Sequence, residues 1–275
     1  MSKPPSGGWD CHGHVFGPYA QCPLAPNRSY TPPEAPASAY LMHLQGLGLS
    51  HGVLVHPSAY GTDHGLLFGT LAAHPQLRGV LVARAGDPLD WSGLRGRGVR
   101  ALRFSARSGA GTNFAGSASF EDLLALAPQL ADAGLHAELW TDCKTLEALA
   151  PQILQLPVPV VIDHMGGFDV QAGTRDAGFV ALLHLLASGR VWIKLCVYRN
   201  LLALPNPSDL EPGRAFHEAM LATNPQRLVW GSDWPHLRVT PAPDALDLLE
   251  TLRGWTTDTG LQRKLLVENP ARLYA

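Results

Sequence analysis

The chain contains 275 residues, carries a formal net charge of −2 and is 46% hydrophobic. This charge balance gives no basic surface for nucleic acid or anionic lipid, so we expect a small-molecule partner and neither a nucleic acid nor a membrane. No stretch approaches the roughly 18 continuous apolar residues of a membrane span, and the polar N-terminus lacks the apolar segment of a secretory signal. The four cysteines are scattered without a C-x-x-C pair, which is typical of reduced thiols. We therefore expect a cytoplasmic protein, and the sequence predicts no particular oligomeric state.

Short β-branched runs alternate along the chain with segments of helical periodicity, a pattern typical of βα units around a parallel sheet. The predicted strands are the run that ends at His14 and the runs 52–56, 79–82, 99–104, 135–139, 158–163, 191–195 and 228–231. Eight strands are the number that closes a (β/α)8 TIM barrel, so we predict one α/β barrel domain over residues 1–275. A doubly wound open sheet is the alternative, although no G-x-G-x-x-G or Walker loop follows an early strand.

Helices are predicted where apolar residues recur at spacings of three and four, over 119–133, 145–155, 179–188 and 212–223. Two more, 242–253 and 257–268, follow the last strand, and the second is expected to end at Asn269-Pro270. We expect this extra C-terminal tail to cover one face of the barrel. The proline-rich stretch 23–36 is predicted to be a long first loop.

The first strand ends in Asp10-Cys-His-Gly-His14. Because side chains alternate along a strand, His12 and His14 point the same way. Two converging imidazoles are typical of a metal site or of an acid/base pocket. A chance H-x-H is the alternative, since the chain has 12 histidines.

The active site of such a barrel lies at the C-terminal ends of its strands, so the residues after each run are the candidates. Asp233 is one of them, and apolar neighbours together with nearby histidines would make its carboxylate a general base. In the pair Asp163-His164 we assign the histidine to the site and the aspartate to a structural role. The other strand ends supply His56, Arg103, Arg107 and His236.

The remaining histidines are interpreted as structural. His56 before a proline could merely close a strand, and His136 is expected to be a hydrogen-bonded core residue toward the bottom of the barrel. His43 and His64 are expected to be helical and solvated. Surface or packing roles away from the barrel mouth are expected for His51, His74, His184 and His217.

Several motifs together resemble the amidohydrolase superfamily, in the branch of TIM-barrel hydrolases that includes 2-pyrone-4,6-dicarboxylate lactonase and sugar lactonases. The resemblance spans nearly the whole chain. It is carried by D-C-H-G-H-V-F-G-P at 10–18, V-I-D-H-M-G at 161–166, W-G-S-D-W-P-H at 230–236 and L-L-V-E-N-P-A-R-L-Y at 265–274.

The resemblance implies hydrolysis of a small, carboxylate-bearing lactone. In that reaction Asp233 would activate water, while His12, His14 and His164 would orient the water and polarise the carbonyl. A guanidinium fork pairs with a carboxylate through two hydrogen bonds, so arginines would hold the acid group of the substrate. The implied substrate-binding residues are Arg103, Arg107, Arg199, Tyr30, Ser58 and His236.

Two departures from the family pattern qualify these implications. Metal-dependent members place a histidine at the end of the fifth strand, where this chain has Trp140. The candidate metal ligands are then His12, His14, His164 and Asp233, and we expect no required metal or, alternatively, one weakly bound divalent ion such as zinc. The dicarboxylate lactonase has an arginine directly after D-H-M-G, where this chain has Gly167, so a lactone with one carboxylate or a sugar lactone fits at least as well.

Two other functions stay open at this point. Relatives on the same barrel decarboxylate aromatic or muconate-like acids with zinc, and such an enzyme would need stoichiometric metal. A non-catalytic barrel that binds a carboxylate ligand is the third reading, since a fold does not imply a function.

Overall fold

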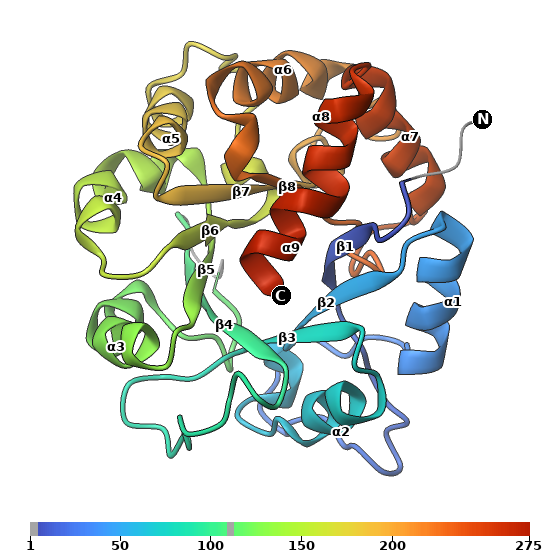
Figure 1. Ribbon diagram of the computed structural model, residues 1–275, viewed down its shortest axis with the longest axis vertical. Coiled ribbons are helices and arrows are strands. Elements are labelled where there is room, and N and C mark those ends of the chain that lie inside the picture. The colour runs from blue at the N-terminus through green and yellow to red at the C-terminus, as the bar shows by residue number, and fades with distance from the viewer. Residues whose placement is uncertain (1–4, 109–112) are drawn as a thin grey trace.

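The computed structural model describes residues 5–108 and 113–275 and shows eight parallel strands in one sheet, ordered β1 to β8 as in the sequence (Figure 1). The strands are β1 Trp9–Gly13, β2 His51–Val55, β3 Leu77–Leu81, β4 Val99–Ala106, β5 His136–Thr141, β6 Val160–Ile162, β7 Val191–Leu195 and β8 Leu228–Trp230. The sheet closes where Gly13 pairs with Trp234, just after β8. The predicted TIM barrel and its eight strands are confirmed, and the open-sheet alternative is wrong.

Helices surround this barrel (Figure 1). They are α1 Ala37–Leu47, α2 Gly65–Ala73, α3 Phe120–Asp132, α4 Cys143–Gln155, α5 Ala177–Ala187, α6 Arg214–Thr223, α7 Ala245–Trp255, α8 Thr259–Arg263 and α9 Asn269–Tyr274. The ranges predicted for α3 to α7 match these within three residues. Helices α1 and α2 are not among the predicted ranges, because both contain glycines, which have a low helix propensity, and neither begins with a capping side chain. None of the described helices is long and apolar enough to cross a membrane.

The C-terminal tail closes the bottom of the barrel, so that the C-terminus lies near the centre of Figure 1. The Tyr274 hydroxyl donates to Glu138 Oε1 inside the barrel at 2.7 Å, and Arg78 and Arg100 donate to the Tyr274 carbonyl. The predicted cover over one face is confirmed. The expected helix end at Asn269-Pro270 is wrong, because a π-turn over Lys264–Glu268 leads into α9, whose first turn tolerates Pro270.

Side chains alternate along each strand between the barrel interior and the helical layer. On β7, Trp192 belongs to the interior cluster that includes Trp9 and Tyr274, whereas Ile193 belongs to the larger cluster that includes helix residues. Lys194 is therefore an interior residue, near the C-terminal end of its strand.

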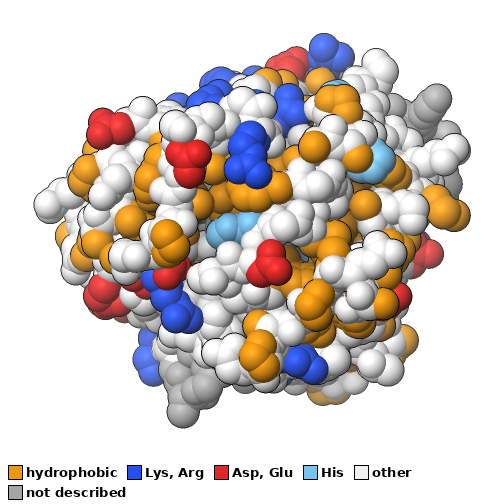
Figure 2. All heavy atoms as spheres, turned by 90° about the horizontal axis from the view of Figure 1, so that it is seen from below, with side chains coloured by type: hydrophobic (Ala, Val, Ile, Leu, Met, Phe, Trp, Pro, Cys, Tyr) orange, Lys and Arg blue, Asp and Glu red, His pale blue; other side chains and the backbone are white. Residues whose placement is uncertain are grey.

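Acidic and basic side chains are interspersed on the side of the molecule shown in Figure 2.

Candidate active site

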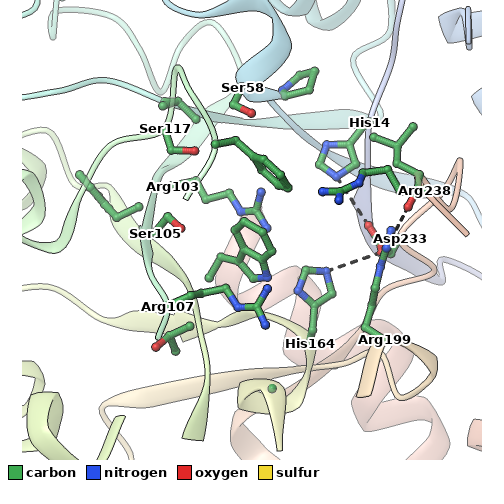
Figure 3. A pocket seen from close by; sticks show the side chains of 18 of the residues that line it. His14, Ser58, Arg103, Ser105, Arg107, Ser117, His164, Arg199, Asp233 and Arg238 are labelled. Atoms are coloured by element: carbon green, nitrogen blue, oxygen red, sulfur yellow. Dashed lines mark hydrogen bonds and ion pairs between the residues drawn. The ribbon is translucent and has the colours of Figure 1, made fainter. Parts of the chain in front are cut away.

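A cavity of about 480 Å³ lies at the C-terminal ends of the strands (Figure 3). Its lining includes all but two of the residues predicted for the site, namely His14, Tyr30, Ser58, Arg103, Arg107, His164, Arg199 and Asp233. The two exceptions are His12 and His236. Trp140 lines the cavity as well, so the end of the fifth strand offers an aromatic ring to this site.

Closure of the barrel brings the first histidine pair to Asp233. The amide of Asp233 donates to the His12 carbonyl at 2.9 Å, and the amide of His14 donates to the Trp234 carbonyl at 2.8 Å. These bonds place Asp233 Oδ1 3.6 Å from Nε2 of both His12 and His14. Residues 220 positions apart thus meet because the first and last strands are neighbours.

The Asp233 carboxylate is surrounded by donors rather than by apolar neighbours. Tyr198 donates its hydroxyl to Oδ2 at 2.7 Å, Arg199 donates its Nε–H to the same oxygen, and Nε2 of His164 lies 3.7 Å away. Figure 3 shows His14, His164 and Arg199 converging on this carboxylate. Burial alone would raise the pKa of Asp233, but opposing effects led by the charge of Arg199 outweigh it, so the pKa lies well below its usual value. The carboxylate is therefore ionised at neutral pH.

The two histidines of the first strand end have different surroundings. His14 Nδ1 lies 2.8 Å from the Val55 carbonyl, which can only accept, so this nitrogen carries a proton and Nε2 faces Asp233. His12 lies beneath the cavity floor, with none of its side chain exposed. Burial, followed by the charge of Lys194, lowers the pKa of His12 to about 3. A direct contact of His12 with water or substrate is therefore not available in this arrangement.

A row of four alternating charges runs from the barrel interior beside His12 to the wall of the cavity, which Arg103 lines. This interior charge row consists of Glu138, Lys194, Asp163 and Arg103. Lys194 Nζ lies 2.5 Å from Glu138 and 3.2 Å from Asp163, and Arg103 Nε donates to Asp163 at 2.7 Å. Burial would lower the pKa of Lys194, but the two carboxylates outweigh it and raise that pKa. The structural role predicted for Asp163 agrees with this geometry.

The sequence reasoning missed Glu138 and Lys194, although a signal existed. Each is a charged residue at an inward position of an otherwise apolar strand, in L-H-A-E-L and V-W-I-K-L. Such residues are almost never fully buried unless they are paired. Two of them with opposite signs predict a pair inside the barrel.

Arginines stand against an aromatic wall of the cavity. The rings of Phe114 and Trp140 stack with centroids 5.2 Å apart. The guanidinium of Arg107 lies 4.7 Å from the Trp140 ring, that of Arg103 lies 5.4 Å from it, and that of Arg238 lies 5.1 Å from the Phe114 ring. Arg238, which the sequence reasoning missed, is exposed and points toward the cavity in Figure 3. The wall thus presents positive charge together with flat apolar surface.

The remaining predicted substrate contacts divide into two groups. Tyr30 and Ser58 line the cavity, and the Tyr30 ring lies 5.3 Å from Phe114. His236 is buried behind Tyr198, with its Nδ1 3.4 Å from the Tyr198 hydroxyl. Its position allows it to support Tyr198, which in turn donates to Asp233.

Two histidines that were expected to be solvated instead form hydrogen bonds within the protein. His43 does lie on α1, but its side chain is 9% exposed and its Nε2 lies 3.2 Å from Ser232 Oγ and 3.3 Å from Asp10 Oδ2. His64 precedes α2 and contacts the Val82 carbonyl at 2.8 Å. These expectations are wrong because the buried Asp10 and the Val82 carbonyl need hydrogen-bond partners, which periodicity on a helix does not reveal.

The other structural histidines agree with expectation in their place. His136 is buried at the start of β5, against the ring of Tyr274 at the barrel bottom. The hydrogen bond expected of it is not formed within the described residues, because its Nε2 lies 3.8 Å from Glu138. His217 on α6 is buried and contacts the Thr256 hydroxyl at 2.9 Å. His56 does line the cavity, but its Nε2 contacts the Gly61 carbonyl, so it fastens the loop after β2.

Three of the four candidate metal ligands come close to the spacing of a zinc site. Oδ1 of Asp233 is 3.6 Å from Nε2 of His12 and of His14, whereas His164 Nε2 lies 3.7 Å from the other oxygen, Oδ2. Two ligands of a tetrahedral zinc ion with bonds of about 2.0–2.1 Å lie roughly 3.3–3.4 Å apart. The donor types are also those that zinc prefers.

The charges around these donors oppose an ion. The interior charge row is neutral in sum, and Arg199 neutralises Asp233. A divalent ion would therefore add two uncompensated charges to a largely buried cluster, which is costly. As arranged, these residues do not fit a divalent ion.

Gly167 cannot accept a side chain without strain. Its φ is +55°, and a Cβ would stand 2.9 Å from the Thr141 carbonyl oxygen and 3.1 Å from the Cα of Asp142. We expect Gly167→Arg to lower the free energy of unfolding by more than the roughly 1–2 kcal/mol of a left-handed backbone alone. Urea unfolding measures this loss. Gly173→Arg is the matched control, because Gly173 has a φ of +77° and no atom within 4 Å of its Cβ position. Equal losses in the two variants would contradict the steric argument.

Comparison with known proteins places the chain among hydrolases of this architecture. It is 34% identical to 4-sulfomuconolactone hydrolase of Rhizobium radiobacter, over 98% of this chain and 90% of the relative. It is 30% identical to 2-pyrone-4,6-dicarboxylate hydrolase of Comamonas testosteroni, over 99% of this chain and 91% of that one. A crystal structure of a probable 2-pyrone-4,6-dicarboxylic acid hydrolase from Acinetobacter baumannii, with citric acid bound, superposes with a TM-score of 0.81 at 25% identity, covering 98% of this chain and 99% of that one.

The family model described as amidohydrolase matches residues 9–275, which extend from the first residue of β1 to the C-terminus. This match contains every predicted site residue and the tail that closes the barrel. The chain belongs to the amidohydrolase family.

Proposed function

We propose that this protein hydrolyses a small lactone that carries at least one anionic group. The observation that carries the proposal is an ionised Asp233 held between imidazoles at the floor of a cavity whose wall presents arginines. The names of the relatives support it, since they are hydrolases of 4-sulfomuconolactone and of 2-pyrone-4,6-dicarboxylate. The bound citric acid of the Acinetobacter baumannii structure is likewise a polycarboxylate.

The proposed reaction begins with water placed between Asp233 and the lactone carbonyl. Asp233 takes a proton from the water as its oxygen bonds to the carbonyl carbon, which forms a tetrahedral intermediate. N–H donors of His164 and an arginine hold the oxygen on which negative charge develops. The ring C–O bond then breaks, and the leaving alkoxide takes the proton from Asp233. The product is a ring-opened hydroxy acid, and no bond other than the ester is cleaved.

No bound metal is required in this proposal. The support is the charge balance of the site, in which Lys194 and Arg199 occupy the positive positions that an ion would otherwise fill. One weakly held divalent ion is the alternative, and assays with and without a chelator separate the two. Activity that is lost with chelator and recovered with zinc would favour the alternative.

The cavity suits a flat, singly ringed acid. Its volume of about 480 Å³ lies in the lower half of the range for small-molecule sites, roughly 300–1,000 Å³. The stacked rings of Phe114 and Trp140 offer a planar apolar surface, while Arg103 and Arg107 beside them offer paired donors. An unsaturated lactone with a carboxylate or a sulfonate matches both features.

A panel of pyrone, muconolactone and aldonolactone substrates tests the function. Purified protein is expected to open the ring of at least one anionic member. Ring opening is measured by the release of acid and by chromatography of the product. Carbon dioxide should not be released. Gas release from a carboxylate substrate without ring opening would overturn the lactonase proposal in favour of a decarboxylase.

Arg107→Gln is expected to raise KM for an anionic lactone about 10- to 100-fold with a smaller change in kcat. The physical reason is the loss of a charge-assisted contact worth roughly 1.5–3 kcal/mol, made to a part of the substrate remote from the reacting carbonyl. Steady-state kinetics on an anionic and on a neutral lactone measure the effect, which should be smaller for the neutral one. Arg97→Gln is the matched control, since its guanidinium also lies over a ring, that of Phe68, but outside the cavity. Equal losses on both substrates would contradict an anion-binding role.

The proposal also includes a cytoplasmic location and a small-molecule substrate as the only class of ligand. Its support is the net charge of −2 and the burial of Cys11, Cys143 and Cys196 as free thiols. Fractionation of cells that express the protein tests the location.

A further inference from the structure

Lys194 makes a contact that the proposed reaction leaves unused. Its side chain is fully buried, and its Nζ lies 2.5 Å from Glu138 Oε2, 3.2 Å from Asp163 Oδ1 and 3.3 Å from His12 Nδ1. An ammonium group has three N–H donors and no acceptor. The three neighbours of Lys194 therefore all face donors, including the ring nitrogen of His12.

This contact determines where His12 carries its proton. A neutral imidazole has one N–H, and a protonated Nδ1 would point its hydrogen at a cation 3.3 Å away. The competing partner for Nδ1 is Asp163 Oδ1 at 3.4 Å, but that oxygen lies nearer to the Lys194 ammonium, at 3.2 Å, which already offers it an N–H donor. The His12 proton consequently lies on Nε2, the nitrogen that faces Asp233 Oδ1 at 3.6 Å.

We propose that Lys194 is a positioning residue that holds His12 in the Nε2–H tautomer and so directs a fixed N–H toward Asp233. Lys194 acts through His12, since it touches neither the cavity nor Asp233 itself. Glu138 fixes the ammonium in turn, and the Tyr274 hydroxyl fixes Glu138. A line of polar contacts thus connects the C-terminal helix at the barrel bottom with the carboxylate at the cavity floor, and its last step is the 3.6 Å approach of His12 Nε2 to Asp233 Oδ1.

The same tautomer decides what His12 can bind. An Nε2 that carries hydrogen has no lone pair for a metal, whereas the other tautomer would aim that lone pair at the space between His14 and Asp233. Without Lys194, the ring proton gains a better partner at Nδ1, namely Asp163 Oδ1. Removing Lys194 should therefore turn His12 from a hydrogen-bond donor into a possible ligand.

The tautomer is tested by ¹⁵N NMR of protein labelled at histidine, with the His12 signals assigned by their loss in His12→Asn. In the unaltered protein we expect the coupling pattern of an Nε2–H ring for His12. An Nδ1–H pattern there would overturn the proposal without any variant. This measurement needs no substrate, so its outcome is separate from that of the lactonase proposal.

Variants extend the test. Lys194→Met alone would leave two buried carboxylates facing one arginine, and it could fail to fold. The double variant Lys194→Met with Glu138→Gln keeps the row neutral, with Asp163 and Arg103 as the remaining pair. In this variant we expect the His12 pattern to change to Nδ1–H and the affinity for Zn²⁺ alone, measured by equilibrium dialysis, to rise at least tenfold. Tyr274→Phe, which leaves the contacts of Lys194 in place, is the matched control and should change neither. A folded double variant with an unchanged tautomer and unchanged zinc affinity would overturn the proposal.

Discussion

Replacement of Asp233 by asparagine is expected to lower kcat for lactone hydrolysis by about 10³-fold or more. General-base catalysis contributes roughly 10²–10⁴-fold, and an amide cannot take the proton from water. The substitution is nearly isosteric, and the amide oxygen can still accept from Tyr198 or Arg199, so the cavity should keep its shape. Initial rates on the best anionic lactone, with KM measured separately, give the effect.

The control for this variant is Asp132→Asn, which removes an exposed carboxylate at the end of α3 and should leave the rate unchanged. Thermal unfolding of both proteins confirms that Asp233→Asn is folded, since the loss of the charge beside Arg199 also affects stability. A folded Asp233→Asn protein that retains wild-type turnover would contradict the role given to this carboxylate.

The barrel could be predicted because its strands and most of its helices obey local rules. Runs such as V-W-I-K-L and G-V-L-V are short, β-branched and separated by helical periodicity, so eight strands follow from the sequence alone. Helices α1 and α2 lack the capping residues that mark a helix start. The continuation into α9 depends on a π-turn, for which the sequence offers no rule.

The site was predictable to the extent that strand ends meet at one face of a barrel. That rule gathers His14, His164 and Asp233 from three strand ends without any knowledge of the loops. The hydrogen-bond partners of these residues could not be predicted in the same way. The hydrogen bonds of Tyr198 and Arg199 to Asp233 depend on the path of a loop, and the burial of His12 depends on packing from every side.

The backbone conformation at the site also could not be predicted from the sequence. His164, Asp233, His236 and Arg238 all adopt φ between +49° and +61°. A non-glycine residue in this region costs of order 1–3 kcal/mol and persists only where the surroundings hold it. These four residues line the cavity or support it, whereas Met165, which shares the conformation with a φ of +56°, is buried in the core. The strain is therefore concentrated at the site but is not confined to it.

Acidification from pH 6.5 toward pH 4 is expected to unfold this protein. Burial is the main cause that lowers the pKa of His12 and His56 to about 3 and of His217 and His236 to about 4. In the unfolded chain these groups would titrate near 6.5, so the unfolded state binds more protons and stability falls as the pH falls.

The size of this effect follows from the number of groups. Each histidine that stays neutral in the folded state costs about 1.4 kcal/mol per pH unit between 6.5 and its folded pKa, so four of them cost roughly 5 kcal/mol per unit. A domain is typically stable by about 5–15 kcal/mol, so about one to three pH units should suffice. Below about pH 4.5 the carboxylates add to the loss with the same sign, because the interior charge row and Arg199 keep the pKa values of Glu138, Asp163 and Asp233 low.

Urea unfolding at several pH values between 7 and 5 measures the slope, and one variant isolates a single histidine. His217 lies on α6 away from the cavity, so His217→Gln should reduce the slope by about 1.4 kcal/mol per pH unit. The lost contact with Thr256 shifts the free energy of unfolding by an amount that does not depend on pH, so slope and offset are separable. His184→Gln, at an exposed position of α5, should leave the slope unchanged. A free energy of unfolding that stays constant from pH 6.5 to 5 would show that these imidazoles gain protons without unfolding, and hence that their burial does not control their titration.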